Sequence, residues 1–222
     1  MVKDLREKPS LFVEKLLDDP MTSGELEPYS YQREFLDDQH ERKVVVAGRQ
    51  CGKTTMMAWL ALHEFALYRN RRILLVAPTK RQAKNFMRKL KAEITHWLRD
   101  EEKYGIKQAQ TMRLEGENGS WIQAVPALEE TIRGLTIDSA FIDEAAFIGR
   151  EVLTSVISPM LATTNGQYVL GSTPWGKEGY LYDKFENDDY WHEYRVASME
   201  NPEIESRQIE EWRRDMTTME FE

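Results

Sequence analysis

Short apolar runs alternate with longer amphipathic stretches through the middle of the chain. Four of the runs are apolar throughout, which is typical of strands buried on both faces of a parallel sheet. They are KVVVAG from Lys43, RILLVAP from Arg72, SAFIDEA from Ser139 and GQYVLGSTP from Gly166. Amphipathic stretches follow three of them and cover Lys53 to about Arg69, Lys80 to about Arg99, and Arg150 to about Leu161. The alternation predicts an α/β fold with a mainly parallel sheet flanked by helices.

Further elements are expected before, within and after this core. Two alternating stretches flank Asn118-Gly119, a strong hairpin signal, so we expect an antiparallel β-hairpin insertion between the second and third apolar runs. Short helices are predicted over Pro9–Asp18 and Tyr31–Asp38. Near the other end, HEYRVA from His192 predicts one more strand, and Pro202–Met216 predicts an amphipathic acidic helix.

Charge is divided unevenly along the chain. Its 222 residues are 41% apolar, and 30 basic against 38 acidic residues give a net charge of −8. Residues 183–222 hold thirteen acidic and five basic residues, so the excess of negative charge lies there, whereas residues 1–182 are balanced. We therefore expect a core domain with N-terminal helices over 1–182 and an acidic lid or linker over 183–222. The balance argues against nucleic-acid binding by bulk charge alone.

Cysteine usage and hydropathy restrict the class of protein. Cys51 is the single cysteine, so an internal disulfide is impossible, and no Cys/His cluster offers a zinc site. The N-terminus is charged from its third residue, and no apolar run approaches the ~18 residues of a membrane span. The sequence therefore predicts an intracellular protein that is neither secreted nor membrane-spanning.

The most informative segment is VVVAGRQCGKTT, residues 44–55. A buried strand runs into a glycine-containing turn and then into a helix, and backbone N–H groups in such a turn surround phosphate oxygens. Lys53 is expected to reach the β and γ phosphates of a nucleotide, and Thr54 to bind Mg²⁺. The expected phosphate-binding residues are Gly48, Arg49, Gln50, Cys51, Gly52, Lys53, Thr54 and Thr55.

This segment matches the phosphate-loop pattern GxxxxGK(S/T) incompletely. Ala47 stands at the first glycine position, and Gly48 is displaced by one. An ordinary strand-to-helix turn that happens to contain GKT is the alternative. Cys51 is interpreted as a small side chain in the loop without a catalytic task.

Polar residues also end two later strands. In AFIDEAAF, residues 140–147, Asp143 and Glu144 lie at the strand end where α/β sheets bind their ligands. Asp143 is expected to hold Mg²⁺ through its water shell, and Glu144 to deprotonate the water that attacks the γ-phosphate. In GSTPWG, residues 171–176, the Ser172 and Thr173 hydroxyls are expected to bond the γ-phosphate or Glu144 and to couple hydrolysis to the next segment. Ordinary strand ends and a plain turn are the alternatives.

Upstream of the phosphate loop, EPYSYQREF (residues 27–35) carries a candidate for base recognition. The Gln32 amide can both donate to and accept from one base edge, which suits adenine, and Tyr29 or Tyr31 can stack on the base. A surface glutamine on a short helix is the alternative.

Basic residues supply two further candidates. Arg49 in the loop and Arg133 in ETIRGLTIDS are candidates for the arginine that stabilises the transferring phosphoryl group, with Arg133 able to act in its own or a neighbouring subunit. Either can instead be a surface or salt-bridged arginine. Residues 80–91 hold six basic and no acidic residues, and a helix would align four of them as a contact for a nucleic-acid backbone or as a solvated face. The four are Lys80, Lys84, Arg88 and Lys91.

In order and spacing, these motifs resemble the ATPase domain of the large subunit of viral DNA-packaging terminases. The resemblance is carried by YQ at residues 31–32, GRQCGKTT, APTKRQAKNFMRKL, TIRG, FIDEAAF and GSTPWGK, and runs from about residue 28 to the end. It implies a P-loop NTPase of the RecA/ASCE-like type with a small C-terminal lid region. It also implies an ATP-driven motor of bacteriophage type that moves double-stranded DNA through a portal protein into a procapsid.

The same resemblance implies partners and residue roles. Implied partners are a small terminase subunit and further copies of the chain in a ring, and the implied location is the host cytoplasm. The resemblance also implies a nuclease domain after the ATPase domain, and this chain is expected to be too short to contain it. The implied roles are adenine contact for Gln32, the arginine of the modified phosphate loop for Arg49, phosphate and magnesium for Lys53 and Thr54, an inter-subunit arginine for Arg133, the strand-end pair for Asp143 and Glu144, and coupling for Ser172 and Thr173. Trp175 and Cys51 depart from the residues usual in the family.

Two other functions stay open from the residues alone. A helicase of the DEAD-like superfamily shares the glutamine, phosphate-loop, DE and STP-type elements, but it needs a second motor domain. A nucleotide-gated binding module that hydrolyses little is the other. Glu144 argues against that module, because a pure switch needs no general base.

Overall fold

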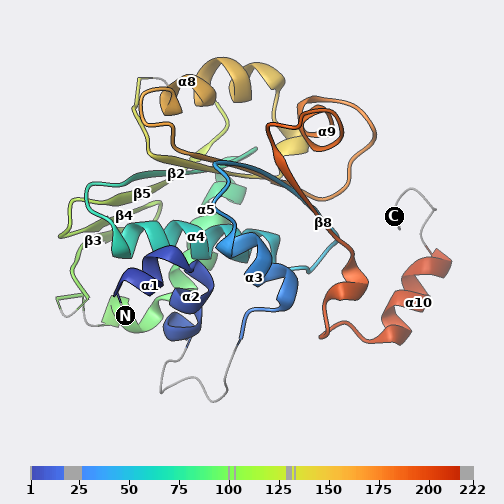
Figure 1. The fold of residues 1–222 in the computed structure, drawn as a ribbon, viewed down its shortest axis with the longest axis horizontal. Coiled ribbons are helices and arrows are strands. Elements are labelled where there is room, and N and C mark those ends of the chain that lie inside the picture. The colour runs from blue at the N-terminus through green and yellow to red at the C-terminus, as the bar shows by residue number, and fades with distance from the viewer. Residues whose placement is uncertain are drawn as a thin grey trace.

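One eight-stranded sheet with helices on both faces forms the centre of the molecule (Figure 1). The computed structural model describes residues 2–17, 27–99, 101–102, 104–128, 132 and 134–215. The strands are β1 (Arg42–Ala47), β2 (Arg72–Ala77), β3 (Ile106–Gln110), β4 (Arg113–Gly116), β5 (Trp121–Pro126), β6 (Ser139–Asp143), β7 (Gln167–Ser172) and β8 (His192–Val196). Their order across the sheet is β3-β4-β5-β2-β6-β7-β1-β8. The predicted α/β class is therefore confirmed.

Strand direction brings three loops to one edge of the sheet. β5, β2, β6, β7, β1 and β8 pair in parallel, whereas β3, β4 and β5 pair antiparallel. β7 lies between β6 and β1, so that Ser172 stands opposite Val46 and Gly171 opposite Asp143. Because these strands run in the same direction, the segments after β1, β6 and β7 leave the sheet side by side.

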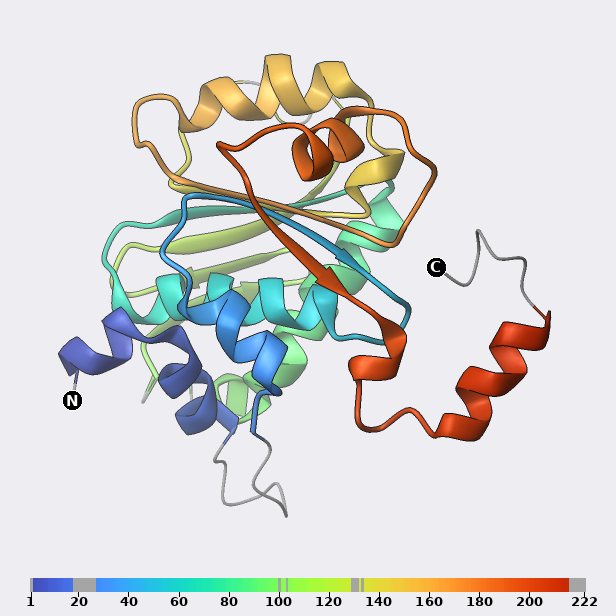
Figure 2. The ribbon, with the colours of Figure 1, turned by 45° about the vertical axis from the view of Figure 1, so that its right-hand side comes forward.

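Helices cover both faces of the sheet (Figure 2). One side carries α1 (Val2–Glu7), α2 (Pro9–Leu17), α3 (Ser30–Asp37), α4 (Lys53–Leu67), α5 (Lys80–Glu93) and α6 (Thr95–Arg99). The other side carries the π-helical turn η2 (Val152–Ile157), α8 (Ser158–Leu161) and α9 (Tyr180–Glu186). Short 3-10 turns η1 (Ala145–Phe147) and η3 (Ser198–Glu200) follow β6 and β8, and α10 (Ser206–Asp215) comes last. Within the described residues, no helix has both the length and the apolar character needed to cross a membrane.

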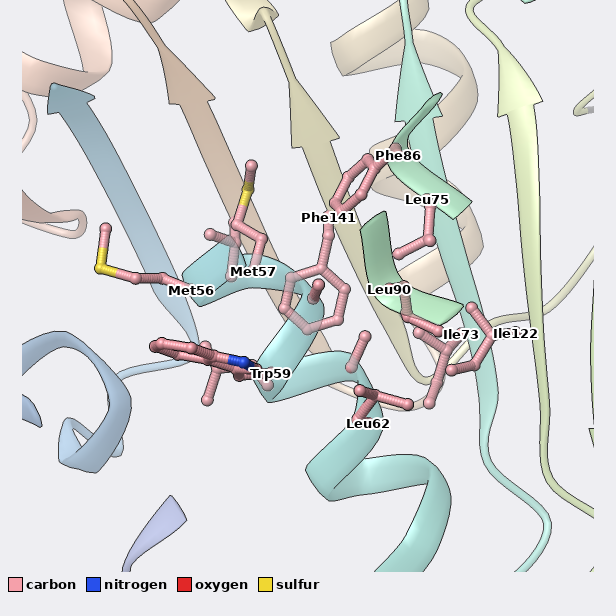
Figure 3. Packing of buried hydrophobic residues seen from close by; sticks show 14 of the residues in the cluster. Met56, Met57, Trp59, Leu62, Ile73, Leu75, Phe86, Leu90, Ile122 and Phe141 are labelled. Carbon is pink, nitrogen blue, oxygen red and sulfur yellow. The ribbon is translucent and has the colours of Figure 1, made fainter. Parts of the chain in front are cut away.

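The central strands are apolar throughout because both of their faces are buried. Leu75 and Phe141 face α4 and α5, where they join Phe86 in one hydrophobic cluster (Figure 3). Their chain neighbours Leu74 and Ile142 point the other way and pack under η2 and α8 in a second cluster. Successive side chains of a strand point to opposite faces, so one run of apolar residues supplies both cores.

The predicted strands form where the sequence places them, and the hairpin is confirmed as β4 and β5. Gly119 lies in its turn with φ at 81°, a left-handed conformation that glycine adopts without strain. Two features differ from the expectation. The stretch before the turn divides into β3 and β4 at Thr111-Met112, and β5 also pairs with β2, so the hairpin extends the main sheet rather than standing apart.

Two predicted helices are interrupted. The helix expected over Lys80–Arg99 breaks at Ile94, which is fully buried and has a non-helical ψ of 29°. β-branched Ile94 and Thr95 have low helix propensity, so burial of Ile94 in the core decides the local conformation. The helix expected over Arg150–Leu161 contains a π-helical turn before α8. Pro159 is a physical reason, because its ring clashes with the carbonyl of the residue four positions earlier in a regular helix.

The helices near both ends of the chain agree with the prediction in part. The helix expected over Pro9–Asp18 is confirmed as α2 and the one over Tyr31–Asp38 as α3, whereas α1 was not predicted. The acidic helix begins at Ser206 rather than Pro202, and its predicted end at Met216 lies outside the described residues. None of the residues of α10 is buried, and it stands away from the sheet (Figures 1 and 2).

Candidate functional site

The loop between β1 and α4 has the form of a phosphate-binding loop. Gln50 and Gly52 both have left-handed backbone conformations, with φ at 64° and 72°, so the chain turns sharply between the strand and the helix. The fifteen-residue α4 begins at Lys53, and its unpaired N-terminal N–H groups point into the turn. Fixed N–H groups of this kind bind anions.

Lys53, Thr54, Asp143 and Glu144 meet at the edge of the sheet. Lys53 is only 7% exposed, and its Nζ lies 3.0 Å from Glu144 Oε1 and 3.2 Å from Asp143 Oδ1. The Thr54 hydroxyl donates to Asp143 Oδ2 at 3.0 Å. Two residues at the start of a helix thus contact two at the end of a strand about ninety positions later. The parallel arrangement of β1 and β6 makes this possible.

Glu144 is held in a strained backbone conformation beside the hydroxyls of the neighbouring strand. Its φ is 53°, and its N–H donates to Asp143 Oδ1 at 3.1 Å. A left-handed conformation at a non-glycine residue costs conformational energy, which contacts with the surrounding structure must offset. Residues strained in this way are frequent at functional sites. The Ser172 and Thr173 hydroxyls donate to Glu144 Oε2 at 3.4 and 3.5 Å. The side chain is therefore anchored at both oxygens, since Oε1 contacts Lys53.

The donor set of Thr54 and Asp143 fits Mg²⁺. A hydroxyl and a carboxylate are hard oxygen ligands, and Mg²⁺ is bound in nucleotide sites by one or two protein oxygens together with phosphates and water. Within the described residues, no group of three or more His, Cys, Asp or Glu side chains could hold a metal by itself. A magnesium ion held by these two oxygens would complete its coordination with water and phosphate oxygens.

The candidate adenine-binding residues lie against the phosphate loop. Gln32 is buried, and its Oε1 accepts from the backbone N–H of Tyr29 at 2.9 Å. Its Nε2 lies so close to Gly52 that a Cβ added there would be 2.8 Å away. The rings of Tyr29 and Tyr31 are 5.8 Å apart, and burial raises the pKa of the Tyr31 hydroxyl. Gln32 is thus a core-facing residue of α3 rather than a surface glutamine.

The candidate arginines and the basic strip are placed differently. Arg49 lies in the loop with an exposed side chain, whereas Arg133 lies outside the described residues. On α5, Lys80, Lys84 and Arg88 are exposed and carry no ion pair among the described residues. Lys91 is half-buried and donates to the backbone carbonyl of Gln110, and burial lowers its pKa.

Sequence reasoning missed a second set of contacts to the loop, made by the segment after β8. Ser198 Oγ donates to Arg49 O at 3.3 Å, and Asn201 Nδ2 donates to Gln50 O at 2.8 Å. Cys51 is 1% exposed and its Sγ lies 3.6 Å from Ala197 O, so burial raises the pKa of the thiol. These contacts exist because β8 pairs with β1, which no local pattern in the sequence indicates.

A family-wide sequence profile matches most of the chain. The family is described as terminase large subunit, T4likevirus-type, N-terminal, and the match covers residues 44–208, which include the phosphate loop and the strand-end carboxylates. The chain belongs to the terminase large subunit family. This terminase chain is 24% identical over 172 residues to the large terminase subunit of Thermus phage G20c. The match covers 67% of the chain but 34% of that relative, so the chain spans about a third of the relative's length.

Solved structures show the same fold for this terminase chain. The large terminase ATPase domain of Thermus phage P74-26 has a TM-score of 0.80 at 22% identity, over 96% of each chain. The large terminase of a thermophilic bacteriophage, solved in complex with ATP-γ-S, has a TM-score of 0.59 at 13% identity, over 95% of this chain and 49% of that one. The predicted fold type and the predicted family are therefore confirmed.

Proposed function

We propose that this terminase chain is an ATP-hydrolysing motor domain and that hydrolysis powers the movement of double-stranded viral DNA into a procapsid. One observation carries the proposal: contacts of 3.0 to 3.2 Å join Lys53 to Asp143 and Glu144, and Thr54 to Asp143, at the carboxyl edge of a parallel sheet. A cation, a hydroxyl and two carboxylates in this arrangement suit a nucleotide triphosphate and the water that attacks it.

The proposed binding groups divide by chemistry. Loop N–H groups and Lys53 hold the phosphates, because the N–H hydrogens carry partial positive charge and the Lys53 ammonium carries a full one. Lys53 is also nearly buried beside the loop. Thr54 and Asp143 would hold Mg²⁺, which when bound offsets phosphate charge and polarises the γ-phosphoryl group. Gln32 is proposed to contact adenine through its amide Nε2, since its Oε1 already accepts a backbone hydrogen bond. Tyr29 or Tyr31 would stack on the base.

Glu144 is the proposed general base. An attacking water transfers a proton to the Glu144 carboxylate while its oxygen bonds to the γ-phosphorus. The bond from that phosphorus to the bridging oxygen breaks, and ADP and inorganic phosphate leave. Ser172 and Thr173 orient the carboxylate through their hydrogen bonds to Oε2 and are proposed to couple hydrolysis to the segment that follows β7.

An arginine is proposed to complete the site. Arg49 is exposed within the loop and is proposed to act in its own subunit. Arg133 is the alternative and is proposed to reach a neighbouring subunit in a ring. The two differ in an observable way, because an arginine supplied by a neighbour makes specific activity rise with protein concentration.

Family membership supports the wider role. We propose a ring of subunits that works with a portal protein and a small terminase subunit in the host cytoplasm, with residues 1–182 as the ATPase core and 183–222 as a lid and linker. The exposed basic side chains on α5 are proposed to contact the DNA backbone, since three of them lack ion pairs among the described residues. These are Lys80, Lys84 and Arg88. Lys91 is a weaker candidate because the Gln110 carbonyl already binds it.

The test is phosphate release from ATP with Mg²⁺, measured for the unmodified chain and for Glu144→Gln over a range of protein concentrations. Loss of a general base should lower kcat by about 10² to 10⁴, with ATP binding retained because the amide keeps the side-chain shape. Glu178→Gln is the matched control, because Glu178 is exposed on the loop before α9. Turnover that survives in Glu144→Gln would contradict the assignment of the base. Binding without turnover in the unmodified chain would instead favour a nucleotide-gated module.

A further inference from the structure

The carbonyl groups of residues 49–51 each accept a hydrogen bond from a side chain outside the phosphate loop. The three pairs are Ser198 Oγ to Arg49 O at 3.3 Å, Asn201 Nδ2 to Gln50 O at 2.8 Å, and Tyr31 hydroxyl to Cys51 O at 3.2 Å. Two of the donors come from the segment after β8 and one from α3. Three consecutive peptide groups of the loop are therefore fixed from outside it.

Fixing these carbonyls also fixes the N–H groups that bind phosphate. A peptide unit is planar and trans, so its C=O and the N–H of the next residue point in opposite directions. Carbonyls turned toward Ser198, Asn201 and Tyr31 therefore turn the N–H groups of residues 50–52 to the opposite side of the loop. A set of N–H groups aimed at one place binds an anion better than a loop that must be ordered on binding.

Asn201 is the best-defined of the three donors. It is 6% exposed, its Nδ2 makes the shortest of the three hydrogen bonds, and its Oδ1 accepts from the N–H of Glu203 at 2.9 Å. The amide is thus held at both ends. Its acceptor belongs to Gln50, whose φ of 64° is unfavourable for a residue with a side chain. A buried donor at that carbonyl keeps Gln50 in the conformation that the loop needs.

The segment after β8 also packs against Gly48, at the start of the loop. Gly48 N–H donates to Val196 O at 2.8 Å. A Cβ at Gly48 would lie 2.2 Å from Ser198 Oγ and 2.8 Å from its backbone nitrogen, so only glycine permits this approach. Loop residues 48, 49 and 50 therefore each contact the segment after β8.

We propose that Asn201 is a positioning residue for ATP, which acts by holding the Gln50 peptide so that the loop N–H groups face the phosphates. The inference rests on the proposed function of the loop. Asn201 contacts no reacting atom, so its loss should raise Kd and KM for ATP by roughly tenfold, the effect of weakening one charge-assisted hydrogen bond from a loop N–H to a phosphate. The kcat at saturating ATP should fall much less, because the Glu144 site is untouched.

The decisive variant is Asn201→Asp. Aspartate keeps the shape and the acceptor for Glu203 N–H, but it cannot donate to Gln50 O and places a negative charge beside it. Tyr31→Phe is a second variant, since it removes one hydroxyl from another element and leaves the segment intact. Met199→Ala is the control, because Met199 lies in the same turn with 59% of its surface exposed. Circular dichroism and thermal unfolding establish that each variant is folded.

Three measurements are made on each folded protein: Kd for ATP by calorimetry, KM and kcat for phosphate release, and hydrogen exchange of the N–H groups of residues 50–52. The expected result is weaker ATP binding and faster exchange at those N–H groups in Asn201→Asp, a smaller effect of the same kind in Tyr31→Phe, and none in Met199→Ala. If the unmodified chain binds ATP and Asn201→Asp binds it equally well, the positioning role is wrong while the proposed function stands. If the unmodified chain binds no ATP, the proposed function itself fails.

Discussion

Glu64→Gln removes an ionisable group from the interior of the domain. Glu64 lies on α4 near the start of β6, and the Ser139 hydroxyl lies 2.7 and 2.5 Å from its two oxygens. Burial away from water raises the pKa of this carboxyl to about 7. The Ser139 hydrogen bond and then the cations Arg71 and Lys43 oppose the rise, and Asp138 adds to it. The loss of solvation is the largest of these effects, so the folded protein holds the carboxyl as the neutral acid at pH values below about 7.

The direction of the pH dependence follows from the raised pKa. The folded state holds this proton more tightly than the unfolded chain, where the carboxyl titrates near 4.5. The stabilisation is therefore fully present below about pH 4.5 and is lost as the pH rises through about 7. A difference of this size corresponds to about 3 kcal/mol between the two ends of the window. Glutamine cannot ionise, so Glu64→Gln should not lose it.

The assay is equilibrium unfolding in urea at pH 5, 6, 7 and 8 for both proteins. Replacing the carboxyl by an amide changes the unfolding free energy by an amount that does not depend on pH. The unfolding free energy of Glu64→Gln relative to the unmodified chain should therefore rise by about 2 to 3 kcal/mol between pH 5 and pH 8. Neighbouring ionisable groups are the same in both proteins and largely cancel. The exposed Glu178→Gln should instead parallel the unmodified chain. A difference for Glu64→Gln that is constant across the four pH values would refute the reasoning.

Two further predictions concern a thiol and a hydroxyl. Cys51 is 1% exposed with a raised thiol pKa, so Ellman's reagent should label it roughly 100-fold more slowly in the native chain than in denaturant; complete labelling of the native chain at the denatured rate would contradict the burial. Tyr168→Phe removes a buried hydrogen bond to Leu153 O of 2.9 Å. It should cost about 1 to 2 kcal/mol in thermal unfolding, whereas the exposed Tyr190→Phe should cost nothing measurable; equal melting temperatures for both would count against the Tyr168 contact.

The sequence predicted what depends on local pattern. Continuous apolar runs identify buried parallel strands, and parallel strands end at one edge of the sheet, so the pattern predicts that Lys53, Asp143 and Ser172 lie together there. The turn at Asn118-Gly119 was predicted from another local signal, the Asn-Gly dipeptide between two alternating stretches. Each of these signals lies within about ten residues of chain.

What the sequence did not reveal depends on contacts between distant segments. Ile94 interrupts a well-patterned helix because its side chain is buried in the core, and the low helix propensity of Ile94 is too weak a signal to predict the break by itself. The donors Ser198 and Asn201 reach the phosphate loop only because β8 lies beside β1 in the sheet, while the pattern from His192 predicts a strand and not its neighbour. Asn201 precedes Pro202, and an asparagine in that position carries no local signal that it contacts the phosphate loop.

The segment that holds Asn201 against the phosphate loop continues directly into α10. α10 starts five residues after Asn201 and has ten residues, so it is about 15 Å long at 1.5 Å per residue. None of its residues is buried, and it stands clear of the sheet. The segment that supplies a buried donor to the phosphate loop therefore becomes a solvent-accessible helix within fifteen residues, so one short stretch of chain joins the loop to the outer surface of the domain.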